Sequence, residues 1–154
     1  MSRILVVEDD SFKSEALVAI ITNVIRRPEI TCSTNVATAI LNVNMHVFDL
    51  IIVDMALPSH SLISGGGSPV SLLNGGLEIL LELNSLDRKD HCIIVTQYPE
   101  IEIGGKFFPV RKSAAAIREH FECDVIECLE YSEESDDWKL KLIKLLENYE
   151  NTTP

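Results

Sequence analysis

The sequence has no uninterrupted apolar stretch near the roughly 18–20 residues that a membrane-spanning helix needs. Its N-terminus passes at once into the short apolar run 4–7, which carboxylates close, so the pattern does not predict a secretory leader. We therefore expect a soluble, cytoplasmic protein that has no membrane partner.

Basic residues are few: 13 Lys and Arg against 24 Asp and Glu give a formal net charge of −11. Proteins that bind nucleic acid usually cluster Lys and Arg, whereas nine acidic residues fall between Glu119 and Asp137 here. Nucleic acid is therefore not expected as a partner. We interpret the acidic segment as a solvated face, and a docking surface for a basic partner is the alternative.

Metal-binding cysteine pairs are also missing, because none of the four cysteines forms a C-x-x-C pair and the four histidines do not cluster with them. A zinc site is not predicted. The expected state is a set of buried, reduced thiols. These are Cys32, Cys92, Cys123 and Cys128.

What the chain does have is an alternation of two hydrophobic periods. With 154 residues, 46% of them apolar, it is long enough for one well-packed domain. The continuous apolar run 4–7 and the segment Phe-Asp-Leu-Ile-Ile-Val-Asp at 48–54 predict strands buried on both faces. Residues 11–25 repeat apolar side chains at helical spacing from Phe12 onward. The same patterns predict further strands at 30–32, 92–96 and 125–131, and helices at 36–43, 76–86, 113–121 and 136–149.

Two stretches interrupt the alternation. Residues 59–75 are too long for an ordinary strand-to-helix connection and include Ser-Gly-Gly-Gly-Ser, so we predict an inserted loop. This glycine run lacks the Lys-Ser/Thr ending of a phosphate-binding loop. A second, irregular loop is predicted over 97–112. The expected organisation is one domain over 1–150 with both loops inside it, followed by a tail at 151–154.

Five strand–helix units predict an α/β fold, a single doubly wound parallel sheet with helices on both faces. Ligands of such sheets bind beyond the carboxyl ends of the strands, at the point where the strand order reverses. Glu8, Asp9 and Asp10 follow the first strand, Asp54 follows the third and Thr96 ends the fourth. Carboxylates that converge from two strands repel one another without a cation, and an all-oxygen set suits Mg²⁺.

These motifs resemble the receiver domain of two-component response regulators, which has a flavodoxin-like (βα)5 fold. The resemblance covers most of the chain and rests on four segments in the family's order. They are Ile-Leu-Val-Val-Glu-Asp-Asp at 4–10, Asp-Met-Ala-Leu-Pro at 54–58, Gly-Leu-Glu-Ile-Leu at 76–80 and Ile-Ile-Val-Thr at 93–96.

The resemblance implies a role for each matched residue. Asp54 is the implied phosphoacceptor. The implied Mg²⁺ ligands are Asp9 directly, Glu8 through a water, Asp54 itself and the carbonyl of Ala56. The implied role of the Thr96 hydroxyl is to hydrogen-bond the phosphoryl group. Asp10 would lie just outside the site.

The chain also departs from this pattern. Receivers carry a Lys at the end of the fifth strand, but 125–131 has none. Either this segment is the fifth strand and the Lys is missing, which we favour, or 107–113 is the fifth strand and ends near Lys112. If the Lys is missing, Lys106, Arg111 or Lys112 could swing over the site from the long loop. Gln97 stands where receivers have a small residue.

The sequence thus predicts a stand-alone receiver, not an enzyme, that accepts a phosphoryl group on Asp54 with Mg²⁺. The implied partners are a histidine kinase or phosphotransfer protein and, for the output, an unknown protein target or a second copy. The alternative is a pseudo-receiver, a protein-interaction module that is not phosphorylated. A haloacid-dehalogenase-like phosphatase is disfavoured, because it needs a second Asp where Ala56 stands.

Overall fold

A five-stranded parallel sheet forms the centre of the computed structural model, which describes residues 1–60, 71–72 and 75–152. Its strands run in the order β2-β1-β3-β6-β9, and every neighbouring pair is parallel. Their bounds are β1 Ser2–Val7, β2 Pro28–Ser33, β3 Leu50–Val53, β6 His91–Thr96 and β9 Asp124–Glu130. The strand order reverses between β1 and β3, so the ligand-binding edge of such a sheet lies at their carboxyl ends.

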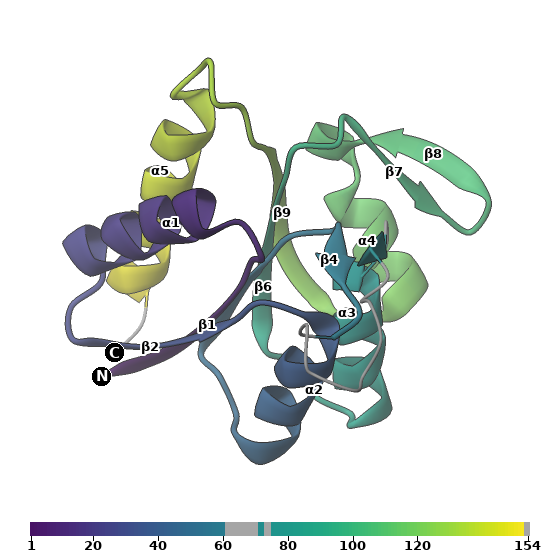
Figure 1. The fold of residues 1–154 in the computed structure, drawn as a ribbon, viewed down its shortest axis with the longest axis horizontal. Helices are drawn as coiled ribbons and strands as arrows, with labels where there is room; N and C mark the ends of the chain where they lie inside the picture. The colour runs from purple at the N-terminus through teal and green to yellow at the C-terminus, as the bar shows by residue number, and fades with distance from the viewer. Residues whose placement is uncertain (61–70, 73–74, 153–154) are drawn as a thin grey trace.

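Helices cover both faces of the sheet. α1 contacts α5 on one side, and on the other α3 contacts both α2 and α4 (Figure 1). The bounds are α1 Ser11–Val24, α2 Val36–Met45, α3 Gly75–Ser85, α4 Ala114–Phe121 and α5 Asp137–Thr152. Among the described residues, no helix is long and apolar enough to cross a membrane.

Alternate residues of each strand point to opposite faces and build two cores. Ile4 and Val6 of β1 belong to the cluster under α1 and α5, whereas Leu5 and Val7 belong to the cluster under α2, α3 and α4. All four are fully buried. The continuous apolar runs of the sequence therefore do mark strands covered on both sides, and the doubly wound fold is confirmed.

The fifth strand of the sheet is β9, so the first of the two sequence-based alternatives is right. The rival segment forms β8 (Lys106–Pro109), which pairs antiparallel with β7 (Glu100–Ile103) in a separate hairpin. A short 3-10 helix, η1 (Val110–Lys112), follows the hairpin. The stretch expected to be irregular therefore has a secondary structure of its own.

Of the predicted inserted loop 59–75, residues 59–60, 71–72 and 75 lie within the described part of the chain. β5 (Ser71–Leu72) falls inside the predicted loop and pairs antiparallel with β4 (Leu57–Pro58), and α3 begins at Gly75. Residues 61–70 and 73–74, which include the glycine run, are outside the described part of the chain. At the other end of the protein, α5 continues to Thr152, past the boundary expected at 150.

None of the four cysteines forms a disulfide, but they are not all buried as expected. Cys32 is exposed because β2 is an edge strand, while the other three are buried. Burial raises the pKa of the Cys128 thiol to about 11 and also raises the pKa of Cys92 and of Cys123. These three thiols are therefore protonated and inert at neutral pH.

Candidate functional site

The carboxylates predicted from the sequence meet at the carboxyl ends of β1 and β3. The backbone N–H of Asp54 donates to the Val7 carbonyl at 3.1 Å, and that hydrogen bond holds the end of β3 beside the end of β1. Ligand oxygens of Glu8, Asp9 and Asp54 all lie within 4.8 Å of one another. Glu8 and Asp54 are buried, with 3% and 7% of their surface exposed, whereas Asp9 is exposed.

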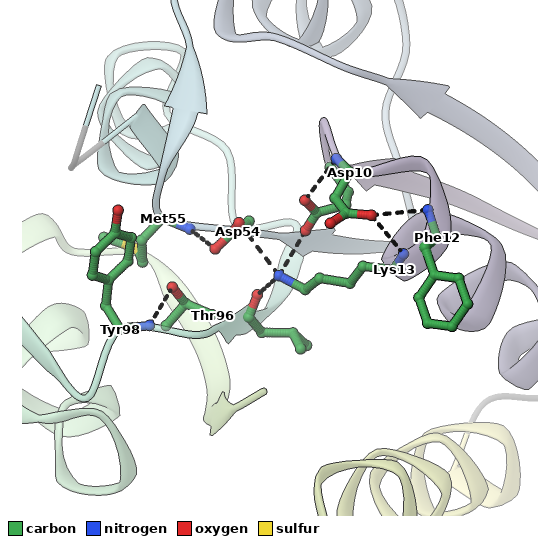
Figure 2. A network of polar contacts seen from close by, with 9 residues as sticks. Asp10, Phe12, Lys13, Asp54, Met55, Thr96 and Tyr98 are labelled. Atoms are coloured by element: carbon green, nitrogen blue, oxygen red, sulfur yellow. Dashed lines mark hydrogen bonds and ion pairs between the residues drawn. The ribbon is translucent and has the colours of Figure 1, made fainter. Parts of the chain in front are cut away.

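The two oxygens of Asp54 have different surroundings. Oδ1 accepts a hydrogen bond of 2.7 Å from the Met55 backbone N–H, so it is turned into the protein. Oδ2 faces the other polar groups of the pocket, where Lys13 Nζ lies 3.3 Å away (Figure 2). Oδ2 is therefore the oxygen presented to a cation or to a reacting group.

Asp10 serves the helix rather than the cluster. Its Oδ1 accepts hydrogen bonds from the backbone N–H groups of Phe12 at 2.9 Å and Lys13 at 3.1 Å (Figure 2). This is the N-cap of α1, which satisfies two N–H groups that have no partner within the helix. The third carboxylate of the Glu-Asp-Asp run thus starts the helix directly behind the pocket.

The residue that sequence reasoning missed is Lys13. Its side chain extends from α1 toward Asp54 (Figure 2) and into the cluster of carboxylates. Lys13 is only 3% exposed. Nζ lies 2.6 Å from Glu8 Oε2 and 3.3 Å from Asp54 Oδ2. It also donates a hydrogen bond of 2.8 Å to the carbonyl of Val95. A cation supplied by the protein itself therefore sits among the carboxylates.

A signal for Lys13 was present in the helical spacing. The apolar face predicted for this helix from the sequence starts with Phe12, but Phe12 is 70% exposed and does not belong to the buried face of α1. Lys13 precedes buried Leu17 by four residues and buried Ile21 by eight, so these three share one face. A lysine in register with a buried face needs a partner in the interior, and here the partners are Glu8 and Asp54.

Burial dominates the electrostatics of Glu8. Its loss of solvent raises the pKa of the carboxyl from 4.5 to about 7, with a further rise from Asp54 and an opposing effect from Lys13. Glu8 Oε1 accepts a hydrogen bond of 3.1 Å from the Asp10 backbone N–H. Oε2 is ion-paired with Lys13 but accepts no well-aligned hydrogen bond in the described structure. It is thus a buried oxygen with bonding capacity left.

The remaining predicted residues lie at the same edge of the sheet. Thr96 is the last residue of β6 and is fully buried, and its Oγ1 accepts a long hydrogen bond of 3.4 Å from the Tyr98 N–H (Figure 2). Ala56 lies in the turn between β3 and β4, two residues after Asp54. Gln97 follows Thr96 and is exposed.

The basic residues of the 97–112 segment that the sequence suggested as substitutes for the missing Lys do not contact the cluster of carboxylates. Among the described residues, no ion pair links Lys106, Arg111 or Lys112 to Glu8, Asp9 or Asp54. Arg111 instead lines a separate cavity between η1, β9 and α5. The cation at the acidic cluster is supplied by α1.

The donor set fits a small divalent cation. When all three carboxylates are ionised, they and the one ammonium have a formal charge of −2, which a divalent ion would balance. The ligands are oxygens, one of them the incompletely bonded Glu8 Oε2, and the exposed Asp9 leaves an open side for the waters that Mg²⁺ retains. Glu8, Asp9 and Asp54 are the residues that could hold such an ion.

The fold and the acidic pocket together define the receiver class of signalling domains, and comparison with known proteins agrees. The Detocs response regulatory protein DtcB of Vibrio alginolyticus is 38% identical over 151 residues, which cover 94% of this chain and 99% of DtcB. No family model matches the chain. At this identity and coverage, the chain belongs to the response-regulator family as a receiver domain.

Solved structures support the same fold. The response regulatory domain of mrkE from Klebsiella pneumoniae is 16% identical, with a TM-score of 0.62 over 97% of this chain and 95% of that one. The response regulator TrrA from Thermotoga maritima, in complex with Mg²⁺-BeF, is 22% identical, with a TM-score of 0.56 over 95% of this chain and 99% of TrrA. These likenesses show the fold.

Proposed function

We propose that this receiver domain accepts a phosphoryl group on Oδ2 of Asp54, with Mg²⁺ as cofactor. The observation that carries the proposal is the position of Asp54. It directly follows the central strand β3, is buried and directs one oxygen at Lys13. Its ligand oxygen lies within 4.8 Å of the Glu8 and Asp9 oxygens. Negative and positive groups thus surround the one oxygen that a phosphodonor would meet.

The reaction is a displacement at phosphorus. Asp54 Oδ2 attacks the phosphorus of a phosphohistidine on a kinase or phosphotransfer protein, an O–P bond forms and the P–N bond breaks. The released imidazole takes up a proton. A protein catalyses such a transfer chiefly by positioning the groups and balancing charge on the phosphoryl oxygens.

Glu8, Asp9, Asp54 and the Ala56 carbonyl would hold Mg²⁺ in the proposed site. When bound, Mg²⁺ would supply charge neutralisation to the phosphoryl oxygens. The net charge of the pocket and the free bonding capacity of Glu8 Oε2 support this assignment. The TrrA structure, which contains Mg²⁺ and BeF, supports it by analogy.

Thr96 has the proposed role of donating its hydroxyl to a phosphoryl oxygen. The residue ends β6 next to β3, and its present bond to the Tyr98 N–H is long at 3.4 Å. Oγ1 is the acceptor in that bond, so the bond does not use the hydroxyl proton, which can be donated to a phosphoryl oxygen. Charged oxygens make shorter and stronger hydrogen bonds than neutral groups.

The output of the domain is proposed to be a change in protein–protein contacts in the cytoplasm, with a separate target or with a second copy. Phosphorylation adds negative charge and acceptor oxygens at the end of the sheet, which biases neighbouring loops and helices between two arrangements. The domain would act as a phosphoacceptor and not as an enzyme with a substrate of its own.

Mass spectrometry of the intact protein tests the proposal directly. Incubation with Mg²⁺ and acetyl phosphate should add about 80 Da, the mass of one phosphoryl group. The gain should vanish with EDTA and in Asp54→Asn, and it should persist in the matched control Asp87→Asn, which lies in the turn after α3. A gain that survives in Asp54→Asn would place the phosphoryl group elsewhere and overturn the assignment.

The pseudo-receiver is the second candidate, and Lys13 is the observation that favours it. An ammonium in contact with Glu8 and Asp54 neutralises part of the cluster, so the pocket has a cation of its own. A protein of this kind would bind neither Mg²⁺ nor phosphate at Asp54. A Mg²⁺ titration by calorimetry separates the two candidates, because only the phosphoacceptor should release or absorb heat that Asp54→Asn abolishes.

A further inference from the structure

The Lys13 ammonium lies beside the oxygen that would carry the phosphoryl group. It makes three contacts, to Glu8 Oε2 at 2.6 Å, to Asp54 Oδ2 at 3.3 Å and to the Val95 carbonyl at 2.8 Å. The contact with the Val95 carbonyl is a hydrogen bond, and the contacts with the two carboxylates are ion pairs. Only one of the three acceptors, Asp54 Oδ2, would change chemically on phosphorylation.

We propose that Lys13 contacts the phosphoryl oxygens on Asp54 and supplies the positive charge that β9 does not provide. This inference rests on the proposed phosphorylation of Asp54. When Oδ2 forms the O–P bond, its negative charge moves to the phosphoryl oxygens, which are attached to that same atom. The donor that faces Oδ2 at 3.3 Å then faces those oxygens.

The surroundings of Lys13 keep its ammonium at this position. The Val95 carbonyl belongs to β6, in the middle of the sheet, and is not altered by the reaction. The Tyr131 ring lies below the ammonium, 5.0 Å from Nζ to the ring centroid, a distance that allows a cation–π interaction. The Lys13 side chain is almost fully buried, so its charge is little screened by solvent.

The end of β9 explains why the charge comes from α1. Tyr131 follows β9 and donates its N–H to the Thr96 carbonyl at 2.7 Å, so it lies at the strand end beside the pocket. Its ring packs on Trp138, with the two centroids 4.9 Å apart. The aromatic pair Tyr131 and Trp138 therefore occupies the end of β9, from which a cation could otherwise have reached the acidic cluster. Lys13 comes from α1 instead, and its ammonium lies over the Tyr131 ring.

Calorimetry with Mg²⁺ alone and then with beryllofluoride, a tetrahedral analogue of the phosphoryl group, tests this role without a phosphodonor. Lys13→Met should bind Mg²⁺ at least as tightly as the wild type, because a competing cation is gone. It should bind beryllofluoride roughly ten- to a hundredfold more weakly, the effect of losing a hydrogen bond to a charged group. The rate of phosphorylation by acetyl phosphate should fall by a similar factor.

Three further variants complete the design. Lys13→Arg keeps the charge and should recover part of the beryllofluoride affinity, which a merely structural role for Lys13 would not explain. Lys13→Gln keeps a hydrogen-bond donor without the charge and replaces Lys13→Met if that variant does not fold. Lys139→Met is the matched control, since Lys139 also lies over an aromatic ring, that of Trp138, at 5.8 Å, and should behave as wild type.

The outcomes separate the two proposals. If the Lys13 variants bind beryllofluoride and accept phosphate as well as the wild type, Lys13 has no such role, while phosphorylation of Asp54 stands. If the wild type takes up neither beryllofluoride nor phosphate, both proposals fall. A loss in Lys13→Met with Mg²⁺ binding retained, and partial recovery in Lys13→Arg, supports the inference.

Discussion

Gly76 and Asp54 are in such close contact that a Cβ on Gly76 would lie 2.4 Å from the Asp54 carbonyl oxygen. The Gly76 N–H also donates to the Met55 carbonyl at 3.0 Å. The first turn of α3 is therefore packed directly on the backbone that carries the candidate phosphoacceptor. Only a residue without a side chain allows this approach, because the atom it would meet is backbone and cannot rotate away.

Gly76→Ala should therefore displace the backbone of Asp54 as well as destabilise the fold. We expect a loss of about 1–3 kcal/mol in the free energy of unfolding, as for other overpacked sites, measured by urea denaturation. Gly75→Ala is the comparison, since its Cβ would meet the Leu57 Cβ at 3.0 Å and the Leu57 backbone nitrogen at 3.3 Å, so the overlap and the expected loss are smaller. Equal stability of Gly76→Ala and the wild type would show that the contact relaxes freely.

A polar cluster at the opposite edge of the sheet yields a prediction about stability alone. Asp90 is buried, and its Oδ2 accepts a hydrogen bond of 3.0 Å from the Phe48 N–H and pairs with Arg88 at 2.5 Å. Arg88 in turn donates to the carbonyls of Val43 and His46. This cluster ties the end of α2 to the start of β3.

Asp90→Ala should cost about 3–5 kcal/mol, because it leaves the Arg88 charge and the Phe48 N–H without their buried partner. Urea denaturation measures the loss, and Asp136→Ala, whose side chain is 80% exposed, is the control that should stay near the wild type. Mg²⁺ affinity should not change in the folded variant. A change in that affinity would mean that the two ends of the sheet are coupled.

The raised pKa of Glu8 predicts how metal-free stability depends on pH. Folding raises the pKa of this carboxyl from 4.5 to about 7, so between these values the folded state holds a proton that the unfolded state releases. The stability contribution of Glu8 therefore falls as pH rises from about 4.5 through 7, by an amount on the order of 3 kcal/mol. Below about pH 4.5 the carboxyl is protonated in both states, so this contribution is fully present and no longer changes with pH.

Glu8→Gln removes this titration. In EDTA, urea denaturation at several pH values should show the wild type losing stability relative to Glu8→Gln as pH rises through that window. Parallel curves for the two proteins would contradict the raised pKa. Excess Mg²⁺ should reduce the slope of the wild type, because a nearby positive charge favours the ionised carboxylate.

The strands and their edge could be predicted from the sequence because their signals are strong and local. The apolar runs at 4–7 and 50–53 fit only strands covered on both faces, and parallel strands place the residues after their carboxyl ends at one edge of the sheet. Glu8, Asp9 and Asp54 are brought together for that reason alone. The helix cap at Asn35, whose Oδ1 accepts from the Thr38 N–H at 2.9 Å, is local in the same way.

The features that could not be predicted depend on side-chain direction and on partners far along the chain. Lys13 shares the helical register of buried Leu17 and Ile21, but this register does not identify the partners of its charge. The partners are Glu8 and Asp54, which follow two different strands. The β7/β8 hairpin had a signal, since exposed Glu and buried Ile alternate over 100–103 before the Gly104-Gly105 turn. The signal is weak because the two strands are short and prolines, Pro99 and Pro109, lie at the two outer ends of the hairpin.

The neighbouring carboxylates Asp9 and Asp10 provide the sharpest test of which acidic residues hold the metal. Asp10 caps α1 through its Oδ1, and Asn is as good a cap as Asp, so Asp10→Asn should keep both the fold and the Mg²⁺ affinity. Asp9 is exposed and within 4.8 Å of the Glu8 and Asp54 oxygens. Asp9→Asn should leave metal-free stability nearly unchanged but weaken Mg²⁺ binding about tenfold or more.

Thermal unfolding with and without Mg²⁺ measures both effects, because a ligand that binds only the folded state raises Tm by an amount that grows with its affinity. The rise in Tm should be similar in the wild type and Asp10→Asn and much smaller in Asp9→Asn. If Asp10→Asn loses the rise and Asp9→Asn keeps it, the metal is held by the carboxylate that caps α1. Because α1 also carries Lys13, such a result would mean that the start of α1 reorganises when the metal binds.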